Sequence, residues 1–320
     1  MKFAAVQMDC VFADVEANLD RAETFVRQSR QKGADLVLLP EFFPSAIGFS
    51  PQMSPVALQG EQVRERMRRL SADSGMIIGG SYLIFNGQDA YNTFDLVFPN
   101  GDIFSHRKDI PTQFENCYYT GGDTEHILHT PIGEIGIALC WEMMRYDTVK
   151  RMSGKVDLVL AGSCWWDLPT DAPAGREPLR EYNQKLAAET PATFAKLLHV
   201  PLIHANHCGQ VTACRFPSGD RQQTRQLVGA AQIINAEGNV IGRRSFREGA
   251  GIVAAELPLE KARQTRKSAD IGTDRRWIPD LPDSYLEAWN KMNPLGSDYY
   301  KAKIRPFYRE QFMENRPENC

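Results

Sequence analysis

Cys140 stands where a short apolar segment gives way to polar residues. Residues 135–139 read Ile-Gly-Ile-Ala-Leu, which is typical of a buried strand, and Glu142 and Arg145 follow in a segment of helical character. A sharp turn between a strand and a helix exposes the side chain at the turn, where a thiol can act as a nucleophile. The free amides at the start of the helix can face the negative charge that such an attack creates. Most free cysteines are buried core residues, so this one predicts chemistry only together with suitable partners.

Three ionisable residues that could be such partners lie earlier in the chain. Glu41 comes directly after the apolar run 36–39 and a proline that blocks the continuation of that strand. Lys108 and Glu115 fall within residues 101–131, which we expect to form a long irregular region. A thiol with an ordinary pKa of about 8.5 is mostly protonated at neutral pH, so a base must take its proton before it can attack.

The remaining segments alternate between strand-like and helix-like patterns. Strands are expected at residues 3–8, 36–39, 76–85, 93–98, 156–161, 201–205, 229–235 and 250–257. Helices are expected between Asp14 and Gly33, around 63–70, from Cys140 to about residue 152 and at 177–199. This alternation favours an α/β fold in which mixed sheets are covered by helices on their faces.

The composition narrows the class of protein. The 320 residues include 42% hydrophobic and 24% charged residues, which is ordinary for a globular enzyme and excludes a wholly disordered chain. A formal net charge of -3 gives no sign of nucleic-acid binding, so a small molecule is the expected partner. No apolar run reaches about 18 residues, so no membrane partner is expected. The seven cysteines show no paired CxxC spacing and the N-terminus shows no signal peptide, which favours a cytoplasmic location.

Three short motifs occur in the order and spacing of one known family. They are Leu38-Leu39-Pro40-Glu41, Lys108-Asp109-Ile110-Pro111-Thr112-Gln113-Phe114-Glu115 and Leu139-Cys140-Trp141-Glu142. On these motifs the sequence resembles the nitrilase superfamily of carbon–nitrogen hydrolases, and the similarity continues through residues 156–163, 204–206 and 233–238. The resemblance implies a four-layer αββα sandwich, with one catalytic domain over residues 1–257. Residues 258–320 would then form a C-terminal extension.

The resemblance also implies a catalytic set. Glu41, Lys108, Glu115 and Cys140 match the two glutamates, the lysine and the nucleophilic cysteine of the family. These residues imply a thiol hydrolase that cleaves a non-peptide carbon–nitrogen bond of a small amide or carbamoyl compound through a thioester on Cys140. Glu41 would act first as base and then as acid. Hydrolysis of a nitrile is the second choice, and a catalytically silent scaffold is the third.

Further residues would stabilise charge or bind the substrate. Lys108 and the backbone amide of Trp141 would face the developing negative charge. Glu142 either orients the site or only complements a helix dipole, and the sequence does not separate these roles. Aromatic residues at strand ends could line the pocket or simply pack: Phe42, Tyr119, Trp165 and Trp166. Residues 143–147 lack the proline and arginine common at this point in the family, which leaves the amidase and nitrilase branches unseparated.

Other kinds of site fit less well. His204 and His207 lie on or after a predicted strand and remain second choices for the base. His126 and His129 do not complete a zinc-binding pattern with their acidic neighbours, so no metal is expected. The glycine pairs lack the GxGxxG and P-loop patterns, so no nucleotide cofactor is expected.

The C-terminal extension is rich in basic and aromatic residues. Its basic residues are expected to form a solvated face: Lys261, Arg263, Arg266, Lys267, Arg275 and Arg276. Its aromatic residues need burial, either on the catalytic domain or against a second subunit: Trp277, Trp289, Tyr299, Tyr300, Phe307 and Tyr308. Together with the resemblance, this apolar load favours a homodimer or a larger homo-oligomer.

Overall fold

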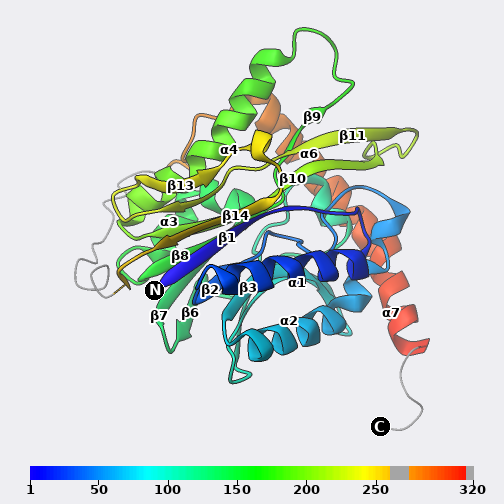
Figure 1. Cartoon of the computed structure of the whole chain (residues 1–320). Helices are drawn as coiled ribbons and strands as arrows, with labels where there is room; N and C mark the ends of the chain where they lie inside the picture. The colour runs from blue at the N-terminus through cyan, green and yellow to red at the C-terminus, as the bar shows by residue number, and fades with distance from the viewer. Residues whose placement is uncertain (260–273, 315–320) are drawn as a thin grey trace.

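The computed structural model describes residues 1–259 and 274–314, whose strands form one mixed sheet (Figure 1). The strands are β1 (Lys2–Asp9), β2 (Leu36–Leu38), β3 (Ile77–Phe85), β4 (Ala90–Val97), β5 (Ile103–Arg107), β6 (Ile127–Thr130), β7 (Gly133–Leu139), β8 (Leu158–Ser163), β9 (Trp166–Pro169), β10 (Leu202–Cys214), β11 (Gln222–Val228), β12 (Ala231–Ile234), β13 (Val240–Arg244) and β14 (Gly251–Glu256). The main path runs β5-β4-β3-β2-β1-β10-β8-β7-β6. Because β3, β2, β1, β10, β8 and β7 are parallel, their carboxyl ends meet at one edge.

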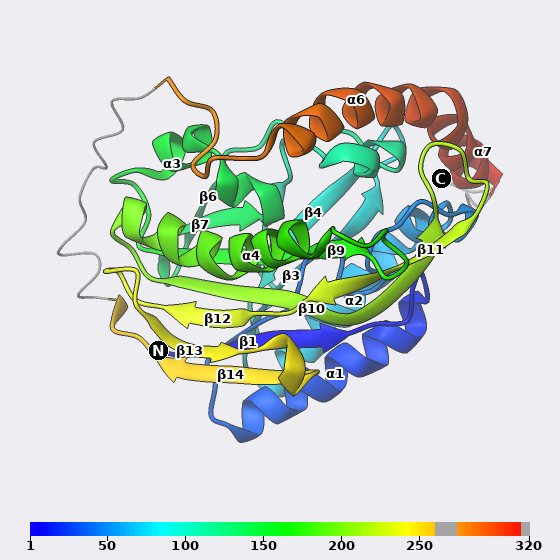
Figure 2. The ribbon, with the colours of Figure 1, turned by 90° about the horizontal axis from the view of Figure 1, so that it is seen from above.

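Helices cover both outer faces of this sheet. They are α1 (Val15–Gln31), α2 (Gly60–Ser74), α3 (Tyr146–Met152), α4 (Glu177–Leu198), α6 (Asp283–Tyr299) and α7 (Arg305–Glu314), with a π-helical turn at Tyr300–Ile304. Asp14 caps α1, because its Oδ1 accepts a hydrogen bond from the Ala17 amide. Figure 2 shows α1 and α4 on opposite sides of the strands.

Alternate side chains of the strands face different cores, and this alternation produces four layers. In β1, Phe3 and Ala5 face an inner core shared by both halves of the sheet, whereas Ala4, Val6 and Met8 face the core beneath α1 and α2. A third core lies between β7, β8 and β10 and the helices α3 and α4. The predicted αββα sandwich is therefore confirmed.

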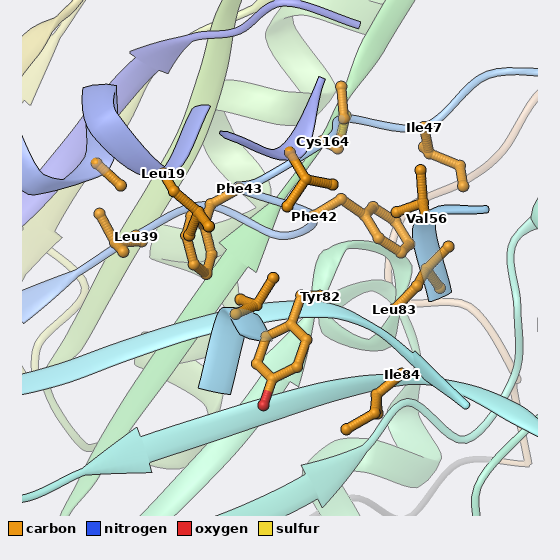
Figure 3. Packing of buried hydrophobic residues seen from close by; sticks show 14 of the residues in the cluster. Leu19, Leu39, Phe42, Phe43, Ile47, Val56, Tyr82, Leu83, Ile84 and Cys164 are labelled. Atoms are coloured by element: carbon orange, nitrogen blue, oxygen red, sulfur yellow. The ribbon is translucent and has the colours of Figure 1, made fainter. Parts of the chain in front are cut away.

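The core beneath α1 fixes the turn that follows β2. Figure 3 shows Leu39, Phe43 and Tyr82 packed together in this core, and the rings of Phe43 and Tyr82 meet edge to face at 6.5 Å between centroids. Phe42 is also fully buried there, with a φ of +51°. Aromatic side chains on both sides of the chain thus anchor the residues next to Glu41.

Several predicted boundaries are wrong. Residues 101–131, expected to be irregular, contain β5, β6 and a 3-10 turn at Gln113–Cys117. β11 and β13 were not expected, and β10 continues to Cys214 instead of ending near residue 205. These segments pair at the periphery of the sheet and are largely half-buried or exposed, so their sequences lack the apolar pattern of a core strand.

The described part of the C-terminal extension packs against its own chain. Trp289, Tyr300 and Tyr308 are buried, and the Tyr300 hydroxyl accepts a hydrogen bond of 2.8 Å from the Ala90 amide. Arg276 is exposed, as expected for a solvated face, and its guanidinium also lies over the rings of Trp277 and Trp289. Basic residues 261–267 lie outside the described residues. Over residues 1–259 and 274–314, no helix combines the length and the apolar character needed to cross a membrane.

Candidate active site

Cys140 occupies a sharp turn at the carboxyl end of β7. Its φ is +53°, in the left-handed region that residues other than glycine rarely adopt. Such a backbone costs about 1–3 kcal/mol and persists only where the surrounding structure enforces it. Cys140 begins a 3-10 turn that ends at Met144, and α3 starts at Tyr146, so the prediction of a helix directly from Cys140 is wrong. The turn places a nearly buried thiol, 4% exposed, at the sheet edge.

Glu41, Lys108 and Glu115 form one buried ion-pair network beside this thiol. Lys108 Nζ lies 2.8 Å from Glu41 Oε1 and 2.8 Å from Glu115 Oε2. Asn92 Nδ2 donates to Glu41 Oε1 over 2.9 Å, and the Cys164 amide donates to Glu41 Oε2 over 3.1 Å. Both oxygens of Glu41 are therefore held in place by donors.

The parallel strands bring these residues together. Glu41 follows β2, Cys140 follows β7 and Cys164 follows β8, all at the same edge of the sheet. A Cβ atom on Gly162 would lie 2.9 Å from the Glu41 amide nitrogen, so the close approach of these two segments requires glycine. On the other side, His207 Nε2 lies 2.9 Å from the backbone oxygen of Glu41. Two neighbouring strands thus fix the turn that carries Glu41.

The two histidines considered as alternative bases occupy structural positions. His207 faces two backbone carbonyls with its ring nitrogens, one of them the Met8 oxygen at 3.1 Å. His204 Nε2 lies 2.9 Å from Ser163 Oγ, and the Ser163 side chain adjoins the Cys140 thiol. Burial lowers the pKa of both histidines to about 4, so both are neutral at pH 7. His204 therefore reaches the thiol only through a hydroxyl group.

Burial and neighbouring charges set the protonation of the site. Burial raises the pKa of Glu41 to about 7, while Lys108 opposes this and Glu115 adds to it. Burial and then the Glu41 charge raise the pKa of the Cys140 thiol well above its ordinary value. Burial alone lowers the pKa of Lys108, but the charges of Glu115 and Glu41 outweigh it and raise this pKa. The site at rest thus holds a neutral thiol, an ammonium and a carboxyl group that titrates near pH 7.

A cavity of about 230 Å³ opens beside the thiol. Cys140, Glu115 and Trp141 line it, together with Trp165 and Trp166. Its volume lies just below the usual range for ligand pockets, about 300–1,000 Å³. The cavity therefore suits a small substrate.

Two of the aromatic residues expected to line a pocket lie behind its wall instead. Phe42 belongs to the core beneath α1 (Figure 3), and its ring is tilted against Tyr119 at 6.0 Å between centroids. The Tyr119 hydroxyl donates to Glu115 Oε2. Tyr119 thus holds Glu115 from the rear, and Phe42, whose φ is positive, packs against Tyr119 in the core.

Helix α6 of the C-terminal extension forms part of the cavity wall. Its Tyr285 lines the cavity and donates to Asn183 Oδ1 over 3.0 Å, the same oxygen that accepts from Trp165 Nε1 over 3.0 Å. Trp289 stacks on Trp141 with a centroid distance of 5.3 Å and an interplanar angle of 5°. The extension therefore contacts the residue that follows Cys140.

The family model for carbon-nitrogen hydrolases matches residues 2–267. The chain belongs to this family of carbon–nitrogen hydrolases. An N-carbamoylputrescine amidase of Solanum lycopersicum is 26% identical over 291 residues, which cover 87% of this chain and 92% of that protein. Nitrilase 3 of Arabidopsis thaliana is 32% identical over 165 residues, so the match spans 44% of this chain and only 47% of the nitrilase's length.

Two solved structures share the fold of this hydrolase. A carbon-nitrogen hydrolase from Helicobacter pylori G27 has a TM-score of 0.71 at 18% identity, covering 83% of this chain and 92% of that chain. An amidase from Nesterenkonia sp. has a TM-score of 0.64 at 20% identity, covering 83% and 93%. The α/β architecture of the hydrolase is therefore that of the nitrilase superfamily.

Glu142 joins the turn at Cys140 to the segment that carries Lys108. Its buried carboxylate accepts a hydrogen bond of 2.8 Å from the Leu139 amide and one of 2.9 Å from the Asp109 amide. Burial by itself raises the pKa of Glu142, but two neighbouring histidines lower it below its ordinary value, so the carboxylate is ionised. Leu139 and Asp109 are the chain neighbours of Cys140 and Lys108. Glu142 is thus placed to position both residues rather than only to complement a helix dipole.

Replacing Glu142 by Gln should lower kcat by about 10- to 100-fold, because the two segments it joins would shift relative to each other. KM should change little, since Glu142 does not line the cavity. Exchange of one acceptor oxygen for a donor should also cost about 1–3 kcal/mol of stability. Steady-state kinetics and thermal unfolding measure both effects, with Glu237→Gln on an exposed turn as control. If Glu142→Gln lowers the stability of the protein but leaves kcat unchanged, the role of Glu142 is purely structural.

A second buried cluster of the hydrolase resembles a metal site in composition. Ligand atoms of His106, His126 and Glu142 lie within 4.8 Å of one another. Two arginines occupy the same cluster, with Arg151 Nη1 2.9 Å from His126 Nε2 and Arg145 Nη2 3.9 Å from Glu142 Oε1. A metal cation would be repelled by these guanidinium groups. The cluster therefore fits an ion-pair network and not a metal site.

Some residues of the site were missed by sequence reasoning. Asn92 on β4 and Ser163 at the end of β8 are buried polar residues that contact Glu41 and Cys140. Their only signal in the sequence is a polar side chain within an otherwise apolar strand. One feature of the sequence indicated that α6 contributes to the cavity, namely the large number of aromatic residues in the C-terminal extension.

Proposed function

We propose that this hydrolase cleaves the carbon–nitrogen bond of a small amide or carbamoyl compound through a thioester on Cys140. The observation that carries the proposal is the position of the thiol. It stands on a left-handed turn at the mouth of a small cavity, with Glu41 and Glu115 bridged by Lys108 beside it. Burial of charge is costly, so a catalytically silent scaffold is not expected to keep two carboxylates and an ammonium group buried together.

The first half-reaction forms the thioester. Glu41 takes the thiol proton as the sulfur attacks the carbonyl carbon and a carbon–sulfur bond forms. The carbonyl oxygen gains negative charge, which Lys108 and the backbone amide of Trp141 stabilise in the cavity. Glu41 then gives its proton to the leaving nitrogen, the carbon–nitrogen bond breaks, and ammonia or an amine departs.

The second half-reaction releases the acid. Glu41 takes a proton from water, whose oxygen attacks the thioester carbon. The carbon–oxygen bond forms, the carbon–sulfur bond breaks, and the sulfur recovers its proton from Glu41. One water is consumed for each bond cleaved, and no oxidant or cofactor enters the balance. Glu115 holds Lys108 in position through both steps.

The similarity to known enzymes supports an amide or carbamoyl substrate first and a nitrile second. The N-carbamoylputrescine amidases align with most of the chain, whereas Nitrilase 3 aligns with less than half of it. An amidase from Nesterenkonia sp. AN1 has been captured with the acetamide moiety of fluoroacetamide added to its active site cysteine. The higher identity of the nitrilase match keeps nitrile hydrolysis as the alternative.

A panel of small amides, carbamoyl compounds and nitriles tests this proposal. Ammonia and carboxylic acid are quantified for each compound after incubation with the purified protein. Turnover of amides or carbamoyl compounds supports the first choice, and acid formed only from nitriles supports the second. If no compound reacts and Cys140 also resists alkylation by iodoacetamide, the proposal fails and a silent scaffold is favoured.

We also propose a cytoplasmic homodimer or larger homo-oligomer. The aromatic residues of the extension do not by themselves require a partner, because Trp289, Tyr300 and Tyr308 are buried within the chain. Light scattering of the full-length protein should give a multiple of the 36.1 kDa chain mass. A measured mass equal to that of one chain would refute the oligomer.

A further inference from the structure

A second cavity, of about 530 Å³, adjoins the catalytic one. The two cavities share four lining residues: Gln113, Trp166, Arg225 and Met292. The second cavity is also lined by Arg215, Arg221 and Lys291, so four cationic side chains face it. None of its described lining residues is an aspartate or a glutamate. The path from the thiol therefore leads into a compartment with an excess of positive charge.

Arg225 is the cation that faces both cavities, and its charge is not neutralised. The guanidinium Nη1 donates to the backbone oxygen of Asp167 over 3.2 Å. Among the residues that the structure describes, no carboxylate oxygen lies within the 4.0 Å of an ion pair with Arg225. Burial lowers the pKa of Arg225, and the more distant charges of Asp167 and Asp171 do not compensate for it.

The nearest carboxylate is already satisfied by other donors. Asp167 Oδ2 accepts from Gln184 Nε2 over 2.7 Å and lies 3.3 Å from Arg180 Nη1. Asp167 Oδ1 accepts from the Leu168 amide over 2.7 Å. Its carboxylate is therefore paired with Arg180 and not with Arg225. The half-buried guanidinium of Arg225 therefore has donors that are not paired with a described carboxylate, and an anionic ligand could accept hydrogen bonds from them.

The other cations are less specific. Arg215, Arg221 and Lys291 are exposed, and Asp220 interacts electrostatically with both arginines. They raise the local positive potential but do not point to one binding geometry. Phe114 stacks on Trp166 at 4.4 Å between centroids, and the two rings form an apolar wall of the second cavity. A ligand that spans the two cavities would therefore contact an apolar surface as well as Arg225.

We propose that the natural substrate is an amide or carbamoyl compound whose far end carries a carboxylate, bound by the guanidinium of Arg225. This inference rests on the proposed function, since it names the substrate class of the same site. A carboxylate matches the paired donors of a guanidinium, and a short methylene chain matches the wall formed by Phe114 and Trp166. The same arrangement disfavours a substrate with a cationic tail, such as N-carbamoylputrescine.

Three primary amides of nearly equal length test the charge preference. They are glutaramate with a carboxylate tail, pentanamide with a neutral tail and 5-aminopentanamide with a cationic tail. The kcat/KM of the wild-type protein should be about 10- to 100-fold higher for glutaramate than for pentanamide, and lowest for 5-aminopentanamide. Equal values for the three amides, or a preference for the cation, would overturn the anion site.

Substitutions assign the preference to one residue. Arg225→Gln should remove the advantage of glutaramate over pentanamide while leaving kcat/KM for pentanamide within about threefold, and Arg225→Lys should keep part of it. Arg69→Gln, which removes the same charge from an exposed position on α2, should leave the ratio unchanged. If Arg225→Gln lowers the values for both amides equally, Arg225 is structural and the inference is wrong.

Binding can be measured without turnover. Calorimetry of Cys140→Ala with glutaramate should show binding that Arg225→Gln in the same background weakens about 10- to 100-fold. Charge-dependent binding without any amide hydrolysis would refute the proposed function and keep the anion site. Hydrolysis of amides without charge dependence would refute the anion site alone.

Discussion

Replacement of Cys140 by Ala should abolish ammonia release from amides, with kcat reduced by about five to six orders of magnitude. The expected loss is this large because the sulfur of Cys140 forms the covalent intermediate. The residual activity of Cys140→Ala is measured as the ammonia released from a reactive amide over hours at high protein concentration. The protein should remain folded, since the mutation removes only one sulfur atom from a position at the cavity.

Two other buried cysteines provide controls for this substitution. Cys208→Ala removes a thiol of β10 that does not line the catalytic cavity, and Cys164→Ala removes the second thiol that does. Both variants should retain activity, because Cys164 contributes its backbone amide to Glu41 and not its sulfur. Activity that survives in Cys140→Ala but is lost in Cys164→Ala would move the nucleophile to Cys164.

Replacement of Glu41 by Gln should lower kcat by about 100- to 10,000-fold. Glutamine preserves the shape of the side chain but cannot take the proton from Cys140. In the wild-type protein, kcat/KM should fall about tenfold per pH unit below pH 7, because the pKa of Glu41 is raised to about 7 and protonated Glu41 is no longer a base. The acidic limb of the pH profile should disappear in Glu41→Gln. Kinetics from pH 5 to 9 measures both effects, with Glu237→Gln again as control.

A near-normal rate in Glu41→Gln would reassign the base to His204, which contacts the thiol through Ser163. The stability of the protein gives an independent check on the same carboxyl group. Its pKa is raised from 4.5 to about 7, so the folded state holds a proton that the unfolded state releases over this range. The contribution of Glu41 to stability should therefore decrease as the pH rises from about 4.5 through 7. Thermal unfolding of Glu41→Gln should lack this part of the pH dependence.

The sequence alone predicted the parts of the molecule that have strong local patterns. The apolar strands before Glu41 and Cys140 and the cap of α1 at Asp14 could be read from spacing, because burial and capping leave regular signals. The motif order around Glu41, Lys108 and Cys140 predicted the family, which the family model confirms. The layered fold followed from that resemblance more than from the alternation of elements.

The rest depends on contacts between segments far apart in the sequence. Asn92 and Glu41 are 51 residues apart and meet only because β2, β3 and β4 are neighbours in the sheet. Phe42 could be assigned to a pocket or to a core until its positive φ and its burial beneath α1 were known. Arg225 lies on a strand that the sequence did not predict, so its position beside the catalytic cavity could not be expected.

The most direct test of the central claim is the mass of the Cys140 peptide during turnover. The 4-nitrophenyl ester of a substrate's acyl group should acylate the protein faster than water releases it, because nitrophenolate is a good leaving group. Acid quenching, digestion and mass spectrometry should then find one acyl group on the peptide with Cys140, and none in Cys140→Ala. If the protein hydrolyses both the ester and the amide but the acyl group is found on another residue, or on no residue, the proposed role of Cys140 is wrong.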